Sequence, residues 1–368
     1  MFPNSPIRVM VVDDSLVFGR YLTGNLPLTN KRIQIVGYAS SALEAIGKLP
    51  EYKPDVITLD VEMPGMSGIE FLKQILPKNP IPVILVSSVN MNVFEALSYG
   101  AVDFVRKPDP TSNFNRQEFI TSLAAKVTIA SRSRVRIPFA AANPAPTASI
   151  PGTAPRQEAR PMGGSALLSL MNPNSPALNA RVIAIGASTG GTEATLEVLK
   201  DLPANMPGIV VTQHMPEGFT KMYAERLNRL CKLTVKEASN GDKIERGTVL
   251  IAPGNQHMKV VRIGNSYSVS CFTAEKVSGH MPSVDVLFRS MADTAKQNGV
   301  GIILTGMGAD GADGLLKMRQ SGAYTIGQDK ESCVVYGMPM VAHDIGGVCI
   351  QASCSNIPRV LINYLNKL

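Results

Sequence analysis

Short apolar runs alternate with amphipathic stretches along the first 130 residues. The runs have the length of buried strands, and the stretches between them repeat apolar residues at helical spacing. Five such strand–helix units predict a doubly wound parallel sheet of the flavodoxin-like kind. The expected strands are Ile7–Val12, Ile33–Tyr38, Val56–Leu59, Val83–Val86 and Val102–Val105.

The same alternation resumes at Arg181 and runs through the rest of the chain. Strands are expected at Val182–Ile185, Ile209–Thr212 and Gly301–Leu304, with a hairpin-like stretch at 257–272. This pattern predicts a second α/β unit, a Rossmann-like domain on a doubly wound parallel sheet. A chain of 368 residues also exceeds the usual size of one domain, so two folded units agree with its length.

The composition changes between these two units. Residues 131–178 are rich in proline and alanine, and residues 131–180 hold five basic residues and one acidic residue. Such a segment cannot bury a core, so we expect a flexible linker between domains at 1–130 and 179–368. An arginine cluster begins this linker, but the net charge of +7 is too low to indicate a nucleic-acid partner.

No apolar run approaches the roughly 20 residues that a membrane helix needs, and the N-terminus lacks a signal-peptide pattern. We therefore expect a cytoplasmic protein without membrane insertion. The five cysteines are odd in number and form no Cys-x-x-Cys pair. Buried reduced thiols are expected in place of a disulfide framework or a zinc site.

Polar residues follow four of the five strands expected in the first unit. Carboxyl ends of parallel strands share one edge, so these side chains should lie together. Three carboxylates in one place repel one another unless a cation lies among them, and oxygen ligands favour Mg²⁺. One carboxylate could attack a phosphorus atom while a serine and a lysine hold the phosphoryl oxygens. The residues are the metal candidates Asp13, Asp14 and Asp60, with Asp60 as the nucleophile, and the phosphoryl contacts Ser87 and Lys107.

The segments VVDDS, LDVEMPGMSG, ILVSS and FVRKP resemble those of the receiver domain of two-component response regulators, from residue 7 to about 128. The resemblance implies that a histidine kinase phosphorylates Asp60, with Mg²⁺ at the acidic residues. Ser67 departs from the family, which usually has aspartate there, but that acid is not a metal ligand. Phe104 occupies the usual aromatic switch position, although a phenylalanine on a strand is equally expected in a core.

The second unit opens with a strand that runs into Gly186-Ala-Ser188-Thr-Gly190. This sequence does not have the Gly-x-Gly-x-x-Gly spacing of a dinucleotide site. It matches Gly-x-Ser-x-Gly, in which small neighbours allow a tight strand-to-helix turn that exposes the serine hydroxyl. A serine before a helix is, however, most often an N-cap, so Ser188 as a nucleophile requires a base and an acid nearby.

The chain has four histidines, and only one directly follows an expected strand of this unit. His214 should lie on the same sheet edge as Ser188, and Asp310 follows a third strand on that edge. The set Ser188, His214 and Asp310 has a chain order that differs from the Ser-Asp-His order of α/β-hydrolases. Backbone N–H groups near Thr189 and in the loop 306–308 are expected to stabilise the oxyanion.

The segments IGASTGG, QHMP, HMPSVDVLF, LTGMGADG and VYGMP resemble the chemotaxis protein-glutamate methylesterase family, over nearly the whole chain outside the linker. The resemblance implies hydrolysis of γ-glutamyl methyl esters on the cytoplasmic helices of chemoreceptors, under control of phosphorylation, and in many members glutamine deamidation. It places the triad on Ser188, His214 and Asp310, and the oxyanion and neighbouring contacts on Thr189 and Met307. No cofactor is expected for the ester chemistry. His280 either lines the substrate groove or lies on the surface.

Three other functions remain open at this point. A transcriptional response regulator needs a short basic helix-turn-helix output, and residues 181–368 are instead long and nearly neutral. A phosphorylation-controlled binding module would use the same fold with Ser188 as a helix cap only. An esterase acting on a receptor outside chemotaxis has the same expected chemistry. A serine-reactive probe separates the binding module from the esterases.

Overall fold

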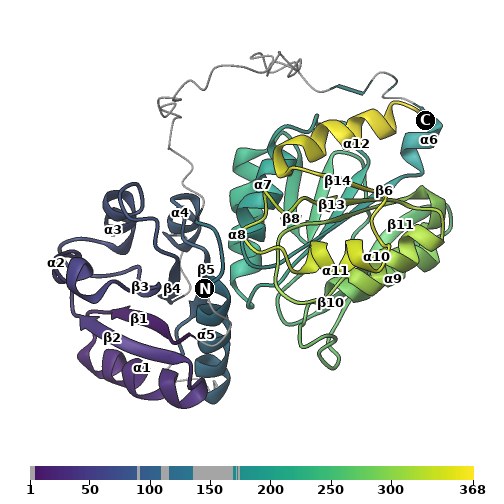
Figure 1. Ribbon diagram of the computed structural model, residues 1–368. Helices are drawn as coiled ribbons and strands as arrows, with labels where there is room; N and C mark the ends of the chain where they lie inside the picture. The colour runs from purple at the N-terminus through teal and green to yellow at the C-terminus, as the bar shows by residue number, and fades with distance from the viewer. Residues whose placement is uncertain (1–4, 89–91, 109–115, 136–168, 171, 173–174) are drawn as a thin grey trace, which may run out of the picture.

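A computed structural model describes residues 5–88, 92–108, 116–135, 169–170, 172 and 175–368. Most of the expected linker therefore lies outside the described residues. The described chain forms two lobes, each built around one parallel sheet with helices on both faces (Figure 1). This is the α/β architecture that the alternation of strands and helices predicts.

The first lobe contains a five-stranded sheet in the order β2-β1-β3-β4-β5, with every neighbouring pair parallel. The order reverses between β1 and β3, so the carboxyl ends of these two strands border a crevice where ligands bind in such sheets. The flavodoxin-like prediction is confirmed. The strands are β1 Ile7–Val12, β2 Ile33–Ala39, β3 Val56–Asp60, β4 Val83–Ser87 and β5 Asp103–Arg106.

Apolar faces of the helices cover this sheet on both sides, and serine residues, Ser15 among them, cap the first turns of three helices. Ser41 accepts a hydrogen bond from the amide of Glu44, and Ser67 forms a capping box with Glu70. Each cap satisfies amide donors that have no partner within the helix. The helices are α1 Leu16–Thr29, α2 Ala42–Tyr52, α3 Gly68–Ile75, α4 Asn92–Ser98 and α5 Arg116–Ala130.

The second lobe contains a seven-stranded parallel sheet in the order β14-β13-β12-β6-β7-β9-β8. The central strands are almost fully buried, as expected when helices cover both faces. The order again reverses beside the first strand of the lobe, β6, whose carboxyl end therefore borders a crevice. The strands are β6 Val182–Ala187, β7 Gly208–Gln213, β8 Thr234–Glu237, β9 Thr248–Ile251, β12 Gly299–Ile303, β13 Tyr324–Gln328 and β14 Ile350–Ala352.

An antiparallel hairpin stands apart from this sheet, where the sequence predicted it. Its strands are β10 His257–Ile263 and β11 Ser266–Phe272, and α9 packs against it. Helices α6, α7, α8 and α12 belong to the core on one face of the sheet, and α9, α10 and α11 to the core on the other. Their bounds are α6 Pro176–Asn179, α7 Gly191–Lys200, α8 Phe219–Leu230, α9 Val284–Thr294, α10 Ala312–Gln320, α11 Met338–Asp344 and α12 Ile357–Leu365, with 3₁₀ turns at 296–298 and 354–356.

The two lobes meet through α4 and β5 of the first and α7 and α8 of the second (Figure 1). Aromatic rings fill the contact: Phe104 lies 4.6 Å from Phe219, and Phe94 lies 5.7 Å from Tyr223, between ring centroids. All four rings are buried. Phe104 is therefore part of the contact between lobes, not only of the core of its own lobe.

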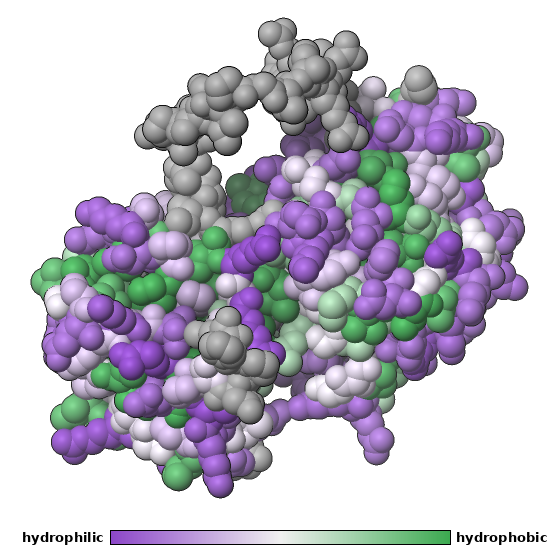
Figure 2. Space-filling view, in the orientation of Figure 1, coloured by the Kyte–Doolittle hydropathy of each residue, from purple (hydrophilic) through white to green (hydrophobic). Residues whose placement is uncertain are grey.

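Polar and apolar side chains are interspersed over the visible face of both lobes (Figure 2). Among the described helices, none has the length and apolar character required to cross a membrane.

Candidate active site and acidic site

The turn after β6 presents Ser188. Its amide donates to the carbonyl oxygen of Thr305 at 3.0 Å, which fixes the turn to the end of β12. The N-cap of α7 is Gly190, with φ 75° and no side-chain cap. Glycine adopts this left-handed conformation without the steric cost that other residues incur. Ser188 therefore does not cap the helix, and its hydroxyl is free to face another residue.

That residue is His214, directly after β7. Its Nδ1 lies 3.1 Å from the Oγ of Ser188, and its Nε2 lies 2.7 Å from Oδ2 of Asp310. A carboxylate only accepts hydrogen bonds, so Nε2 carries the proton and Nδ1 accepts from the serine. The two ring nitrogens are exchanged relative to the serine protease triad, in which Nε2 faces the serine. The three residues nevertheless form one hydrogen-bonded chain.

Asp310 is held at the start of α9. It accepts hydrogen bonds from the Ser283 hydroxyl at 2.7 Å and from the amides of Val284 at 2.8 Å and Asp285 at 3.0 Å. Burial favours a raised pKa of Asp310, but the hydrogen bonds from His214, Asp285 and Ser283 outweigh it and lower the pKa below its ordinary value. The carboxylate is thus ionised and fixed in one orientation.

A second imidazole covers the proposed base. The rings of His280 and His214 stack with centroids 3.7 Å apart and planes inclined by 13°. Burial, and then the neighbouring His214, lower the pKa of His280 to about 4. His280 is therefore a neutral ring at physiological pH. The sequence left two positions open for His280, the substrate groove and the surface. Its ring is half-buried against His214 and so does not lie free on the surface.

Two backbone amides at the site are available as donors. Within the described part of the chain, no hydrogen-bond acceptor is recorded for the N–H of Thr189 or of Met307. The N–H of Gly306, in the loop expected to supply donors, is instead taken by the carbonyl of Val335. A Cβ built on Gly306 would lie 2.7 Å from the Cβ of Ser188. Only glycine allows this loop to approach the serine so closely.

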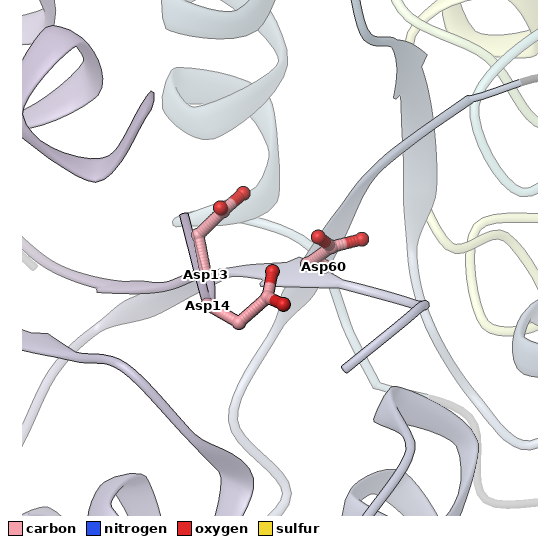
Figure 3. A group of neighbouring side chains, drawn as sticks. All are labelled: Asp13, Asp14 and Asp60. Atoms are coloured by element: carbon pink, nitrogen blue, oxygen red, sulfur yellow. The ribbon is translucent and has the colours of Figure 1, made fainter. Parts of the chain in front are cut away.

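The acidic residues of the first lobe gather at the carboxyl ends of β1 and β3 (Figure 3). Ligand oxygens of Asp13, Asp14 and Asp60 all lie within 4.8 Å of one another. Three carboxylates at this spacing fit a hard divalent cation such as Mg²⁺. Asp13 and Asp60 are buried, and Asp14 is exposed, so the set is open to solvent on one side.

Lys107 closes the other side of this group. Its Nζ lies 2.5 Å from Asp60 and 2.9 Å from Asp13. Burial raises the pKa of Asp60 against the opposing effect of Lys107. Burial acts to lower the pKa of Lys107, but hydrogen bonds to Asp60 and Asp13 outweigh it, so that this pKa is raised and the ammonium stays charged. The buried hydroxyl of Ser87 has no hydrogen-bond partner among the described residues, and a phosphoryl oxygen would supply one.

One contact joins the first lobe directly to the residue beside Ser188. The hydroxyl of Thr189 donates to Oδ2 of Asp103 at 2.5 Å, and both side chains are buried. Asp103 also pairs with Lys126 at 2.7 Å. An exposed ion pair between Lys276 and Glu118 bridges the lobes at 2.6 Å.

The packing between the lobes is incomplete. A cavity of about 390 Å³ lies beside the contact, lined by residues of both lobes that include Leu97, Ala101, Leu196 and Val334. Tight interfaces resemble protein interiors and leave few voids larger than water. The two lobes therefore do not pack as closely here as a protein interior does.

Three contacts of the site were not expected from the sequence. They are the hydrogen bond from Ser283 to Asp310, the hydrogen bond from Thr189 to Asp103, and the stacking of His280 on His214. Ser283 precedes an amphipathic helix, and that signal indicates only a cap. Asp103 begins a strand in a different lobe, and nothing in the local sequence relates it to Thr189. Contacts of this kind depend on how distant loops and lobes meet.

Comparison with known proteins identifies both lobes. The model of the response regulator receiver domain matches residues 9–117, and the model of CheB methylesterase matches residues 183–361. A Syntrophomonas wolfei protein named protein-glutamate methylesterase/protein-glutamine glutaminase 2 is 46% identical over 364 residues, 98% of each chain. The chain belongs to the CheB methylesterase family. This methylesterase is thus an ester hydrolase and a response regulator in one chain.

Another relative and two solved structures are also similar to this chain. A Geobacter metallireducens protein named protein-glutamate methylesterase/protein-glutamine glutaminase 1 is 43% identical, over 99% of this chain and 97% of its own. The catalytic domain of Thermotoga maritima CheB is 38% identical and covers 50% of this methylesterase and 98% of its own chain, with a TM-score of 0.49. The response regulator domain of the same protein is 41% identical over 34% of this chain and 96% of its own, with a TM-score of 0.32.

Proposed function

We propose that this methylesterase hydrolyses γ-glutamyl methyl esters on the cytoplasmic helices of chemoreceptors, releases methanol, and is activated by phosphorylation. The observation that carries the proposal is the hydrogen-bonded chain from Ser188 through His214 to Asp310 at the carboxyl edge of the sheet. The names of relatives that match almost the whole chain supply the substrate class. Action on receptor helices places the protein in the cytoplasm.

Ester cleavage takes place in two halves. The Oγ of Ser188 attacks the ester carbonyl carbon as Nδ1 of His214 takes the hydroxyl proton. His214 then donates that proton to the departing methoxide, so that methanol leaves and an acyl-enzyme remains. A water molecule loses a proton to His214 and attacks the acyl carbon. The ester bond to Ser188 then breaks, His214 returns the proton to the Oγ of Ser188, and the released carboxylic acid ionises to the glutamate carboxylate.

The surrounding groups stabilise charges that exist only during these steps. The free amides of Thr189 and Met307 are the donors proposed for the oxyanion of each tetrahedral intermediate. Asp310 keeps the proton on Nε2, so that Nδ1 is the basic nitrogen, and stabilises the imidazolium that forms. The neutral ring of His280 stacks on that imidazolium and excludes water from one face.

Relatives named as glutaminases extend the proposal to receptor glutamines. The amide carbon takes the place of the ester carbon, and His214 donates its proton to the amine, which leaves as ammonia. Both reactions produce the same acyl-enzyme, so one triad serves both substrates.

In the receiver domain, we propose that Asp60 takes a phosphoryl group from a histidine kinase of the chemotaxis pathway. Asp13, Asp14 and Asp60 would hold Mg²⁺, which neutralises charge on the transferring phosphoryl group. Lys107 exchanges its ion pair with Asp60 for the phosphoryl oxygens, and the unpartnered hydroxyl of Ser87 donates to one of them.

Control is proposed to act through the contact between the lobes. In the unphosphorylated protein, the receiver covers part of the active site and places the carboxylate of Asp103 on Thr189. Phosphorylation of Asp60 displaces Lys107 and favours an arrangement of β5 and Phe104 that no longer packs on Phe219. The incomplete packing of this contact supports such an opening.

Labelling by a fluorophosphonate probe separates this proposal from a binding module. Full-length protein should be labelled on the peptide containing Ser188, and Ser188→Ala should not be labelled. Ser355→Ala, which changes an exposed serine of the same lobe, is the matched control and should label as the wild type does. If the wild type is not labelled, with or without a phosphodonor, then Ser188 is not an activated nucleophile.

A further inference from the structure

A buried glutamine lies directly beneath the triad, and the mechanism above assigns it no part. Gln213 is the last residue of β7 and precedes His214. Its side chain is 3% exposed. Its Nε2 donates to the carbonyl oxygen of Ser188 at 2.9 Å and to that of His214 at 3.2 Å. One amide group therefore joins the backbones of the proposed nucleophile and base.

The surroundings fix the orientation of this amide. The Ser188 carbonyl also accepts from the N–H of Gly191 at 2.7 Å, so it is a well-defined acceptor. Rotation of the amide by half a turn would place Oε1 of Gln213 against two carbonyl oxygens. A Cβ built on Gly191 would collide with Oε1. The amide of Gln213 therefore occupies space that is open only because residue 191 is glycine.

The backbone alone cannot make this connection. The ladder between β6 and β7 ends at the pair Ala187 and Gln213, and the amide of His214 donates to the carbonyl of Ala187 at 3.1 Å. Ser188 and His214 lie beyond that point, where the two chains turn away into different loops. The side chain of Gln213 extends the cross-link between the strands by one residue, up to Ser188.

We propose that Gln213 is a positioning residue that holds the Oγ of Ser188 within hydrogen-bond reach of Nδ1 of His214. It contacts neither the substrate nor the reacting atoms, and acts only through the two backbones. A displacement of about 1 Å between catalytic groups can cost roughly 100-fold in rate. This inference rests on the triad of the proposed function.

The test measures the kinetics of fluorophosphonate labelling on the full-length protein. Gln213→Met keeps the length of the side chain but has no donor. This variant should lower the maximal labelling rate by about 10- to 100-fold, with the half-saturating probe concentration unchanged. Gly191→Ala, which displaces the same amide from the other side, should lower the maximal rate in the same way.

A distant substitution distinguishes positioning from a general loss of stability. Leu361→Ala removes buried apolar atoms from α12, which contributes no residue to the triad, and its melting temperature is compared with that of Gln213→Met. At a comparable fall in melting temperature, its maximal labelling rate should equal that of the wild type. An equal loss of rate in Leu361→Ala, or an unchanged rate in both Gln213→Met and Gly191→Ala, overturns the proposal. A wild type that is not labelled contradicts the proposed nucleophile itself, which is a different result.

Discussion

Asp310 performs two tasks with one carboxylate. It orients His214, and it accepts the free amides at the start of α9. We predict that Asp310→Asn lowers kcat for methanol release by about 10⁴-fold, because an amide can present a donor to Nε2 and so stabilise the wrong tautomer. Asp285 is a buried acid beside Asp310 whose side chain contacts neither Ser188 nor His214, so Asp285→Asn is the control. Equal losses in the two variants would show that the effect comes from the start of α9 and not from the tautomer.

His280 should make the stability of the catalytic lobe depend on pH. Its pKa of about 4 lies below the ordinary histidine value of 6.5, so the unfolded chain binds this proton first as the pH falls. Stability is therefore fully present above pH 6.5 and is lost between pH 6.5 and 4.

We predict that the free energy of unfolding of the catalytic lobe falls by about 2 kcal/mol from pH 7 to 5 through His280. Urea unfolding of wild type and His280→Gln at both values measures this difference. The variant should lose less stability than the wild type over that interval. A loss as large in the variant as in the wild type contradicts the assignment to His280.

Strand ends explain how far the sequence could predict the site. Ser188 and His214 directly follow buried strands, Asp310 lies in the loop after a third, and parallel strands bring such positions to one edge. The sequence could not predict which ring nitrogen faces the serine. Nor could it predict that the side chain of Gln213 joins the backbones of Ser188 and His214, because that contact depends on how two loops meet.

At the scale of elements, the geometry of the site depends on how closely the loop after β12 approaches the turn that carries Ser188. A methyl group on Gly306 would collide with Ser188 and with the sulfur of Met338. We predict that Gly306→Ala lowers kcat by about 10- to 100-fold through this displacement. The same chemical change at Gly47, inside α2 with nothing near its Cβ, should leave kcat unchanged and stabilise the receiver by about 0.5–1 kcal/mol. Wild-type kcat in Gly306→Ala would show that the loop has room to spare.

Several of the strands that the sequence predicted are buried along their whole length. They are β3, β4, β6, β7 and β12. Four strands of the second sheet were not predicted: β8, β9, β13 and β14. Of these, β8 and β14 are edge strands of three or four residues with partly exposed side chains. The pattern of a fully buried strand does not apply to them.

At the scale of the whole molecule, two contacts between the lobes differ in their expected effect. Asp103 accepts from Thr189 at the active site, whereas Glu118 pairs with Lys276 in solvent. We predict that Asp103→Ala raises the methanol release of unphosphorylated protein by about 5- to 150-fold, the range of typical allosteric couplings.

Glu118→Gln is the matched control, because an exposed ion pair contributes only about 0–1 kcal/mol. It should raise the unphosphorylated rate less than Asp103→Ala does. If the two variants behave alike, the receiver acts as a steric cover, and the Thr189 hydrogen bond has no special part.

The sequence indicated two lobes, but not the surface through which they meet. Phe104 matched an aromatic switch position or a core position equally well, and the structure shows its ring against Phe219 of the other lobe. An apolar side chain on a buried strand gives no local signal that its neighbour belongs to another lobe. The contact arises from side chains that lie more than 100 residues apart in the chain.

The most direct test of the central claim is methanol release from methylated chemoreceptor membranes. Wild type, Ser188→Ala and Asp60→Asn are compared, each with and without a small phosphodonor and Mg²⁺. The account predicts release by the wild type that the phosphodonor increases, basal release without that increase in Asp60→Asn, and none in Ser188→Ala. Release by Ser188→Ala at the wild-type rate, or no release by the wild type in either state, would contradict it.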